Sequence, residues 1–501
     1  MRLGIDFGTT RVVVAAADRG NYPVVTFDAG GGESREWFPS LCAQRDGEFL
    51  FGHAALAVVS DPDWTICRSL KRLLSTAGPH DQALGIPVTQ LAARFLAALV
   101  AALRAHSNLR LVPDEPLEVA IAVPASANAN QRLLTGDAFT AAGFQVLRML
   151  DEPSAAGLEY AWRRPDDARV KHRHVAVYDL GGGTFDASVI AMSDTLHEVI
   201  TTAGAMRLGG DDFDEVLLGQ CLAQLERPAP ATRAEHDRLL EICRQEKERF
   251  TTSTRRLRPD MMWAGREPNI PVAEYEAALS PLIQKSLDVL ADALDRSGEI
   301  IGREIAKNTV IYQVGGASQL PTVARVLREQ YGRRVWRSPY PHASVAIGLA
   351  IAAEDAERSR ILGRFTRFFG VWREGAAGQA AVFDPLFAKD TPLPESPASP
   401  LVRTRRYRAA HNIGHFRFVE CSRLTVDGTP SGDVAPWREV RFPLVRELVG
   451  KALERIEVAR LASPGEEVEE QYRCTANGVI EVEIANLTSG YQSRFQLHGM
   501  E

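Results

Sequence analysis

The sequence predicts a large α/β domain followed by a smaller, β-rich domain, and two patterns carry this prediction. Up to about residue 353, short apolar runs that end at proline or glycine alternate with longer helical patterns, which is typical of α/β architecture. Beyond it, most of the chain alternates apolar and polar residues, as in 478–488. We therefore expect an α/β domain over 1–353, a linker over 354–373 and an all-β domain over 374–501.

Individual elements of the first domain follow from the spacing of its apolar residues. Three runs, at 117–125, 174–180 and 308–316, are predominantly apolar and are predicted to be buried strands. Two segments, 236–253 and 274–298, carry apolar residues at helical spacing with a polar face opposite. These two segments are predicted to be helices.

Composition argues against several classes of protein. The chain has 58 basic and 64 acidic residues and a formal net charge of -6, which gives no electrostatic footprint for nucleic acid or for an anionic membrane. Its most apolar helical window, 91–106, contains Arg94 and Arg104 and falls short of a clean membrane span. The residues after Met1 do not form a basic stretch followed by an apolar core. We therefore expect a soluble protein without a signal peptide.

Cysteine usage points to a reducing compartment. No two cysteines form a Cys-x-x-Cys pair, so the sequence predicts neither a zinc site nor a disulfide framework. Because scattered, unpaired cysteines are typical of reducing conditions, we expect the protein in the cytoplasm. The cysteines are Cys42, Cys67, Cys221, Cys243, Cys421 and Cys474.

One plan occurs twice in the first domain. Residues 4–10, GIDFGTT, and 178–186, YDLGGGTFD, each place an aspartate and an apolar residue before glycine and threonine. Glycine lets the backbone turn tightly and point several N–H groups at one place, which suits phosphate oxygens. Asp6 and Asp179 precede the turns and are placed to hold Mg²⁺ through its water shell. Two such turns predict a clamp for one nucleoside triphosphate.

A third glycine pair follows a predicted strand at 314–321, VGGASQLP. Two glycine hairpins and this pair, in this order, resemble the actin-like ATPase superfamily, which includes sugar kinases, actin and the DnaK-type heat-shock chaperones. Within the superfamily, residues 123–161, residues 201–217 and the KRLL of 71–74 resemble the DnaK-type chaperones. The resemblance implies an α/β actin-like (ribonuclease H-like), two-lobed ATPase domain that binds ATP or ADP with Mg²⁺.

The second domain resembles the same family more loosely. Residues 412–418, NIGHFRF, and 474–497 are similar to strands of the family's β-sandwich, which implies a domain that binds extended peptides. The family's acidic, leucine-rich linker is replaced by 358–372, which puts coupling between the domains in doubt. No counterpart of the helical lid follows the last strand, so we expect a lidless variant.

The resemblance also implies roles for single residues. Lys71, Glu152, Asp179 and Thr184 match the catalytic residues, and Lys71 is placed to orient the attacking water and to stabilise charge on the γ-phosphate. Asp6 and Asp179 match the aspartates that hold Mg²⁺ through water. The residues that match the nucleotide site are Asp6, Gly8, Thr9, Thr10, Gly181, Gly182, Gly183, Asp186, Gly209, Gly210, Lys247, Glu248, Gly315 and Gly316.

Two departures concern the nucleoside end of this site. The family often has an arginine and a glutamate lining the purine, and this chain has Glu248 and Arg244 in swapped positions. The swap can preserve an ion pair, but it weakens the argument for a guanidinium stacked on the purine. An acidic residue of the family is His342 here. Phosphate binding is therefore predicted more firmly than adenine recognition.

Partners are implied in the same way. Arg148 matches the family arginine that contacts J-domain co-chaperones, although an exposed structural arginine is an equally good interpretation. Pro124 and Arg132 match residues that relay the nucleotide state, with a strand-ending proline and a surface arginine as the alternative. A nucleotide-exchange factor and unfolded or extended polypeptide are the other expected partners.

These inferences predict an ATP-dependent molecular chaperone of the DnaK type, in which ATP hydrolysis regulates the binding of extended apolar polypeptide segments during protein folding and stress response. One alternative is a nucleotide-gated binding module for a dedicated protein partner, which the altered linker favours. A second alternative is a small-molecule kinase, which the DEPSAAG of 151–157 and the lack of a recognisable sugar-binding carboxylate argue against.

Overall fold

The computed structural model describes residues 1–59, 61–76, 81–125, 127–165, 174–192, 196–205, 207–354, 360–394, 399–475 and 478–496. It divides into two compact units, one of residues 1–126 with 134–361 and the other of residues 127–133 with 362–501. Residues 355–359 of the predicted linker lie outside the described residues. The rest of that linker contains β20 (Arg360–Leu362) and the start of β21 (Phe368–Gly375).

The first unit contains two mixed sheets that repeat one plan. In each sheet the first strand of an antiparallel hairpin is followed outward by two parallel strands. The first sheet has the order β12–β11–β1–β2–β5, formed by Gln145–Asp151, Glu118–Val123, Arg2–Phe7, Arg11–Ala16 and Phe38–Pro39. The second has the order β19–β18–β13–β14–β15–β20, formed by Val335–Arg337, Val310–Val314, His174–Leu180, Phe185–Ala191, Leu196–Ala205 and Arg360–Leu362.

The predicted strands and helices of the first domain are confirmed, with shifted ends. The strands β11, β13 and β18 lie within the three predicted runs. The helix α7 (Arg233–Glu248) ends before the predicted residue 253, because Thr251 and Thr254 close a turn through their backbone and side-chain hydrogen bonds. The helix α8 (Val272–Ile301) is longer than predicted although Pro281 lies inside it.

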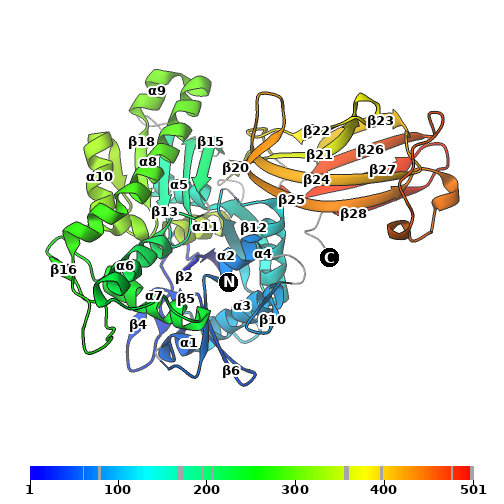
Figure 1. The fold of residues 1–501 in the computed structure, drawn as a ribbon. Coiled ribbons are helices and arrows are strands. Elements are labelled where there is room, and N and C mark those ends of the chain that lie inside the picture. Colours follow the sequence, from blue (N-terminus) through cyan, green and yellow to red (C-terminus); the bar gives the residue numbers. More distant parts are fainter. Residues whose placement is uncertain are drawn as a thin grey trace. The chain divides into compact units, whose positions relative to one another are not determined.

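Two helices, α5 (Glu152–Arg163) and α11 (Ser344–Glu354), lie between the two sheets (Figure 1). α11 packs on β1 and β11, α5 packs on β13 and β14, and the two helices contact each other. Their approach requires glycine, because a Cβ at Gly348 would lie 1.7 Å from the carbonyl oxygen of Ala155. A Cβ at Gly4 of β1 would similarly lie 2.2 Å from the carbonyl oxygen of Ala346. These contacts bring the two sheets together.

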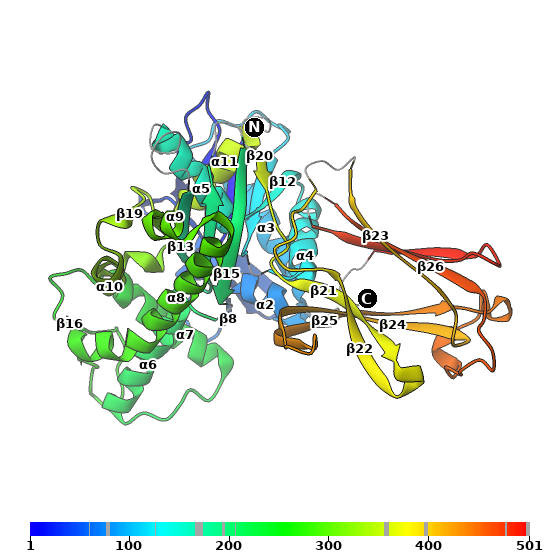
Figure 2. The ribbon, with the colours of Figure 1, turned by 90° about the horizontal axis from the view of Figure 1, so that it is seen from above.

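The remaining helices cover the outer faces of the sheets. α3 (Val88–Ala105) packs on the first sheet, and α8 lies along β15 of the second, as Figure 2 shows. Among the described helices, only α3 is long and apolar enough by length and composition to cross a membrane. Its Leu91, Phe95 and Leu99 are fully buried in a core that it shares with β1 and β11.

Shorter elements complete the first unit. The other helices are α1 (His53–Ala57), α2 (Leu70–Thr76), α6 (Gly210–Leu225), α9 (Arg303–Asn308) and α10 (Pro321–Tyr331), together with the part of α4 (Ala129–Ala141) from residue 134 onward. The other strands are β3 (Phe27–Asp28), β4 (Ser34–Arg35), β6 (Leu41–Arg45), β7 (Glu48–Phe51), β8 (Thr65–Arg68), β9 (Gln82–Ala83), β10 (Ile86–Pro87), β16 (Arg256–Leu257) and β17 (Ile270–Pro271).

A buried histidine makes the stability of the first unit depend on pH. His197 of β15 is 6% exposed, its Nδ1 has no hydrogen-bond partner among the described residues, and burial lowers its pKa to about 4. The unfolded chain binds this proton near pH ~6.5, so stability falls by up to about 3 kcal/mol as the pH drops from ~6.5 towards ~4. We expect His197→Phe to flatten this part of the pH profile of urea unfolding.

The exposed His106 provides the matched control for this prediction. His106→Phe should leave the acid slope of the unfolding free energy as it is in the unaltered chain. An equal slope in the His197→Phe and His106→Phe variants would show that His197 titrates normally in the folded state.

The second unit consists of two antiparallel sheets that share one core. Figure 2 shows β23 and β26 in one layer and β21, β22, β24 and β25 in the other. The first sheet has the order β22–β21–β24–β25, formed by Ala380–Phe387, Phe368–Gly375, Ile413–Leu424 and Pro430–Pro443. The second has the order β23–β26–β27–β28, formed by Leu401–Arg408, Glu467–Cys474, Ile480–Asn486 and Gln492–Gln496.

The alternating patterns singled out in the sequence build this core. In β27, Ile480, Val482 and Ile484 are fully buried, and in β24 the side chains of Phe416 and Phe418 point into the same core. Because these apolar side chains fill the space between the sheets, they do not form a surface for a ligand.

A charged cluster also lies between the two sheets. Arg373 of β21 donates hydrogen bonds to both carboxylate oxygens of Glu470 on β26, at 3.1 and 2.8 Å, and to Asp384 at 2.6 Å. Arg405 of β23 donates to both oxygens of Asp384, at 2.9 and 2.8 Å. Burial alone would raise the pKa of Asp384, but the hydrogen bonds from Arg405 and Arg373 outweigh it and lower the pKa. The core of this unit is therefore partly ionic.

Candidate functional site

A cleft of about 480 Å³ lies in the first unit, at the turns of the two repeated hairpins. Most of the residues predicted for the site line it, whereas Gly183, Asp186 and Gly209 do not. The predicted residues that line the cleft are Asp6, Gly8, Thr9, Thr10, Lys71, Glu152, Asp179, Gly181, Gly182, Thr184, Gly210, Lys247, Glu248, Gly315 and Gly316. Segments far apart in the sequence are thus brought to one place.

The two hairpin turns approach so closely that only glycine fits. A Cβ at Gly182 would lie 2.0 Å from Thr10 Oγ1, and one at Gly183 would lie 2.5 Å from Thr9 Oγ1. Gly209 packs against the other side of the same turn, where a Cβ would lie 2.6 Å from the Gly182 carbonyl oxygen. Gly183 and Gly209 therefore support the turns from outside the cleft.

Acidic side chains gather beneath the turns. Glu152 is the first residue of α5. Asp6 and Asp179 are the second-last residues of β1 and β13, just before the two hairpin turns. Burial raises the pKa of Asp6 to about 7, although the charge of Lys71 acts in the opposite direction. Burial, and then the charges of Glu152, Asp6 and Asp186, raise the pKa of Asp179 well above its usual range.

Lys71 is the cation in this acidic cluster. It is 5% exposed, and its Nζ donates a hydrogen bond to Glu152 Oε1. Burial alone would lower the pKa of Lys71, but the negative charges of Glu152 and Asp6 outweigh it and raise the pKa. Since one ammonium faces Asp6, Glu152, Asp179 and Asp186, and the pKa values of Asp6 and Asp179 are raised, these carboxylates lack positive charge nearby, which a proton or an added cation would supply.

The chemistry of these carboxylates suits a cation held through water. No three of the Asp, Glu, His or Cys side chains in the described part of the chain are grouped so as to hold a metal ion directly. Mg²⁺ characteristically keeps several waters and binds few carboxylates. Asp6 and Asp179 therefore fit the water-mediated role predicted from the sequence.

The end of the cleft that is predicted to hold the nucleoside is formed by α7 and by the turn after β18. Lys247 Nζ donates to the Gly210 carbonyl oxygen at 2.6 Å and lies 2.7 Å from Asp214. The pair predicted from the swap is present, because Arg244 Nη1 donates to Glu248 Oε1 at 2.9 Å. Gly315 has φ +87°, and a Cβ there would lie 2.4 Å from the Leu180 carbonyl oxygen, so glycine is required.

Sequence reasoning missed several residues of this end. Arg11 Nη2 donates to Glu248 at 2.5 Å, and its guanidinium lies 4.2 Å from the centre of the Trp37 ring. Gln319 and Arg337 line the cleft and are joined by a 3.0 Å hydrogen bond. Arg11 directly follows the first glycine turn and Gln319 lies within the stretch of the third glycine pair, which were usable signals, whereas nothing near Trp37 or Arg337 in the sequence marks them.

Three predicted residues lie away from the cleft. Pro124 is buried just beyond the end of β11, and Arg148 is half-buried on β12, the edge strand of the first sheet. Arg132 is half-buried on α4. Their proposed roles concern partners and signal relay, which stay predictions.

Comparison with known proteins identifies the family. Residues 87–356 match the family model described as Hsp70 protein, which is more than half of the chain. The chain belongs to the Hsp70 family. The matched range includes Glu152, the second glycine hairpin, α7 and the third glycine pair, so the family assignment covers most of the cleft of this Hsp70-family chain.

Three curated relatives are each named Chaperone protein HscA homolog. The relative from Bordetella petrii is 31% identical over 381 residues, 72% of this chain and 59% of its own length. Those from Polynucleobacter necessarius subsp. necessarius and Tolumonas auensis are 32% and 31% identical over 372 and 374 residues, 70% of this chain in each case and 58% and 57% of their own lengths. The matches thus span less than two thirds of these relatives.

Proposed function

We propose that this Hsp70-family chain binds ATP with Mg²⁺ in the cleft of its first unit, hydrolyses it, and acts as an ATP-dependent chaperone. One observation supports this most: two glycine turns meet at Gly182 and Thr10, directly beside buried carboxylates and Lys71. The repeated plan of the two sheets supports the actin-like, two-lobed class of ATPase. The chaperone part of the proposal is supported by the HscA homologues.

The cleft suggests how hydrolysis proceeds. Bound Mg²⁺ supplies positive charge to the phosphate oxygens. The backbone N–H groups of the turns at 8–10 and 181–184 would donate to these oxygens, and Asp6 and Asp179, which line the same cleft, would hold the cation through water. Lys71, fixed by Glu152, orients the attacking water and stabilises the charge that develops on the γ-phosphate. Catalysis by charge and positioning, without a strong base, predicts slow turnover.

The Arg244–Glu248–Arg11 ion-pair chain lines the end of the cleft that would hold the nucleoside, so adenine recognition has a test of its own. Titrating the full chain with ATP and with GTP under one set of conditions tests it. We expect saturable binding of ATP. Equal affinity for GTP would leave the phosphate clamp in place and remove adenine selectivity from the proposal.

We further propose that the second unit binds extended apolar polypeptide segments and that ATP hydrolysis regulates this binding. The test is ATP turnover of the full chain with and without a chemically unfolded polypeptide, with the same polypeptide in its folded state as control. Stimulation by several unrelated unfolded chains would support a general chaperone. Stimulation by one ligand out of a broad peptide array would instead support a binding module for a dedicated partner.

We propose Arg148 as the contact for a J-domain co-chaperone, because a cationic side chain on an edge strand suits an acidic partner surface. If a J-domain protein stimulates ATP turnover, Arg148→Asp should remove the stimulation by reversing the charge and leave basal turnover unchanged. Full stimulation of the variant would exclude this contact.

A cytoplasmic location is proposed as well, supported by six free, buried cysteines.

A further inference from the structure

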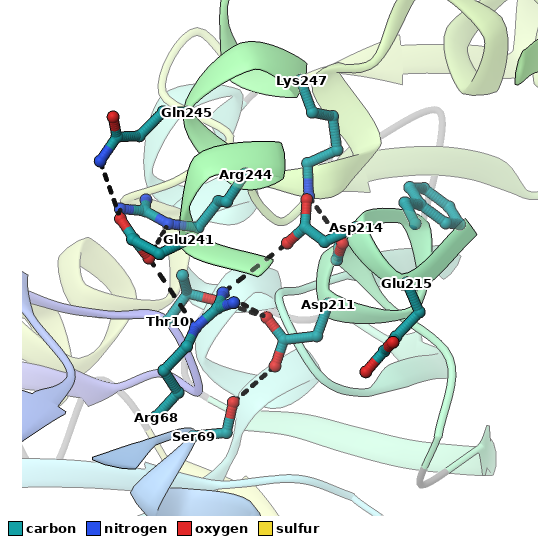
Figure 3. A network of polar contacts seen from close by, with 12 residues as sticks. Thr10, Arg68, Ser69, Asp211, Asp214, Glu215, Glu241, Arg244, Gln245 and Lys247 are labelled. Atoms are coloured by element: carbon teal, nitrogen blue, oxygen red, sulfur yellow. Dashed lines mark hydrogen bonds and ion pairs between the residues drawn. The ribbon is translucent and has the colours of Figure 1, made fainter. Parts of the chain in front are cut away.

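The segment that carries Lys71 is tied to the N-terminal turn of α6. Ser69 Oγ donates to Asp211 Oδ2 at 2.6 Å, and Arg72 Nη2 donates to Asp212 Oδ2 at 2.8 Å (Figure 3 shows the Ser69 contact). Ser69 has φ +57°, a left-handed conformation that a non-glycine residue keeps only where its surroundings hold it. Lys71 therefore stands on a backbone that α6 constrains.

Arg68 lies at the centre of these contacts, although it does not line the cleft. It is 5% exposed, and its guanidinium is surrounded by three carboxylates from two helices (Figure 3). Its Nη2 lies 3.7 Å from Asp211 and 3.7 Å from Asp214 of α6, and its Nε lies 3.8 Å from Glu241 of α7. Neither Nη1 nor Nη2 makes a hydrogen bond with any residue that the structure describes. Arg68 therefore acts on these carboxylates through its charge.

Arg68 supplies one of the positive charges that face this buried cluster of carboxylates. Arg68, Arg244 and Lys247 supply three positive charges, and Asp211, Asp214 and Glu241 supply three negative ones. Each of the three carboxylate side chains is less than a tenth exposed, so solvent screens the cluster weakly. Without Arg68, the remaining cation beside Asp214 would be Lys247 and that beside Asp211 would be the less buried Arg72, whose Nη1 lies 4.0 Å from Asp211, the residue that holds Ser69.

The same cluster reaches the nucleoside end of the cleft. Arg244 joins Glu241 to Glu248, and Lys247 joins Asp214 to the carbonyl oxygen of Gly210. Arg68 consequently connects the helix that lines one end of the cleft with the segment that places Lys71 at the other end.

We propose that Arg68 is a positioning residue that fixes Lys71 in the cleft by holding the carboxylates of α6 and α7 against residues 68–72. The role of Lys71 in this inference rests on the proposed ATP hydrolysis. Because a misplacement of about 1 Å can cost about 100-fold in rate, the loss of Arg68 should lower kcat far more than it raises KM.

The test compares Arg68→Met, Arg68→Lys and Arg249→Met in the full chain, where Arg249 is an exposed arginine just after α7. For Arg68→Met we expect kcat to fall about 10- to 100-fold, with KM for ATP changed less than about threefold. Arg68→Lys keeps the charge and should recover most of the lost kcat, and Arg249→Met should behave as the unaltered chain. An Arg68→Met variant that changes KM alone, or leaves kcat within about twofold, overturns the proposal.

A second variant separates positioning from folding. Arg68→Met combined with Glu241→Gln removes one positive and one negative charge, and replacing a buried ion pair in this way is often close to neutral for stability. We expect this double variant to regain the thermal unfolding midpoint without regaining kcat. Recovery of both would mean that Arg68 only stabilises the fold.

Hydrogen exchange provides a readout that does not depend on turnover. Arg68→Met should speed amide exchange over residues 65–74 in the apo chain, whereas Arg249→Met should not. If the unaltered chain does not hydrolyse ATP, the proposed function fails. The hydrogen-exchange comparison then decides the structural role of Arg68 by itself. Unchanged exchange over 65–74 would then overturn the proposal.

Discussion

Replacing Lys71 with alanine should lower ATP turnover by at least about 100-fold while leaving nucleotide affinity nearly unchanged. Among the described residues, Lys71 is the one buried cation that faces the carboxylates Asp6, Glu152 and Asp186. No other positive charge in this described cluster can replace it. The glycine turns that are proposed to hold the phosphates do not depend on it. Single-turnover hydrolysis and equilibrium titration with ATP measure the two quantities separately.

Lys285→Ala is the matched control, because Lys285 is an exposed lysine on α8. It should leave both quantities unchanged. Normal turnover in the Lys71→Ala variant would remove Lys71 from the mechanism, and the inference about Arg68 would lose its target at the same time.

Replacing Glu470 with leucine should destabilise the second unit by about 3 kcal/mol. Glu470 is fully buried and accepts hydrogen bonds from Arg373, Tyr407 and Tyr472. Burial alone would lower the pKa of Arg373, but its hydrogen bonds to Glu470 outweigh it and raise the pKa. Removing the carboxylate leaves the half-buried Arg373 with Asp384 as its carboxylate partner, and leaves the hydroxyl groups of Tyr407 and the fully buried Tyr472 without this acceptor.

Urea unfolding of the full chain measures this loss of stability. Hydrogen exchange over residues 368–496 assigns the loss to the second unit. Glu483→Leu on the neighbouring strand β27 is the control, since Glu483 pairs with the exposed Arg494 and surface pairs are worth roughly 1 kcal/mol or less. If both variants lose the same small amount, the Arg373–Glu470 contact contributes no more than a surface pair does.

The two glycine hairpins were predictable because their signal is local. An aspartate, an apolar residue and glycines stand together at 4–10 and 178–186, and each stretch folds as one hairpin with antiparallel register. The strands β11, β13 and β18 follow from their apolar runs for the same reason. The repeat led us to infer that the two turns meet. The structure shows this meeting in the close approach of Gly182 to Thr10.

The ionic clusters were not predictable, because their partners are far apart in the sequence. Arg68 is the last residue of the short strand β8, and its three carboxylate partners lie on α6 and α7. Arg373 and Glu470 are 97 residues apart and meet only when the two sheets pack. In the second unit the alternation of apolar residues correctly indicated strands, but it did not reveal that a charged layer shares their core.

The most direct test of the central claim, that the two glycine turns form a nucleotide clamp, is calorimetric titration of the full chain and of its Gly182→Val variant with ATP and Mg²⁺. Because a Cβ at residue 182 would lie 2.0 Å from Thr10 Oγ1, the valine side chain must push the turns apart. The account predicts saturable binding by the unaltered chain and loss of at least about 100-fold in affinity in the variant, equivalent to about 2.7 kcal/mol. Equal affinity in the two proteins, or no binding by the unaltered chain, would contradict it.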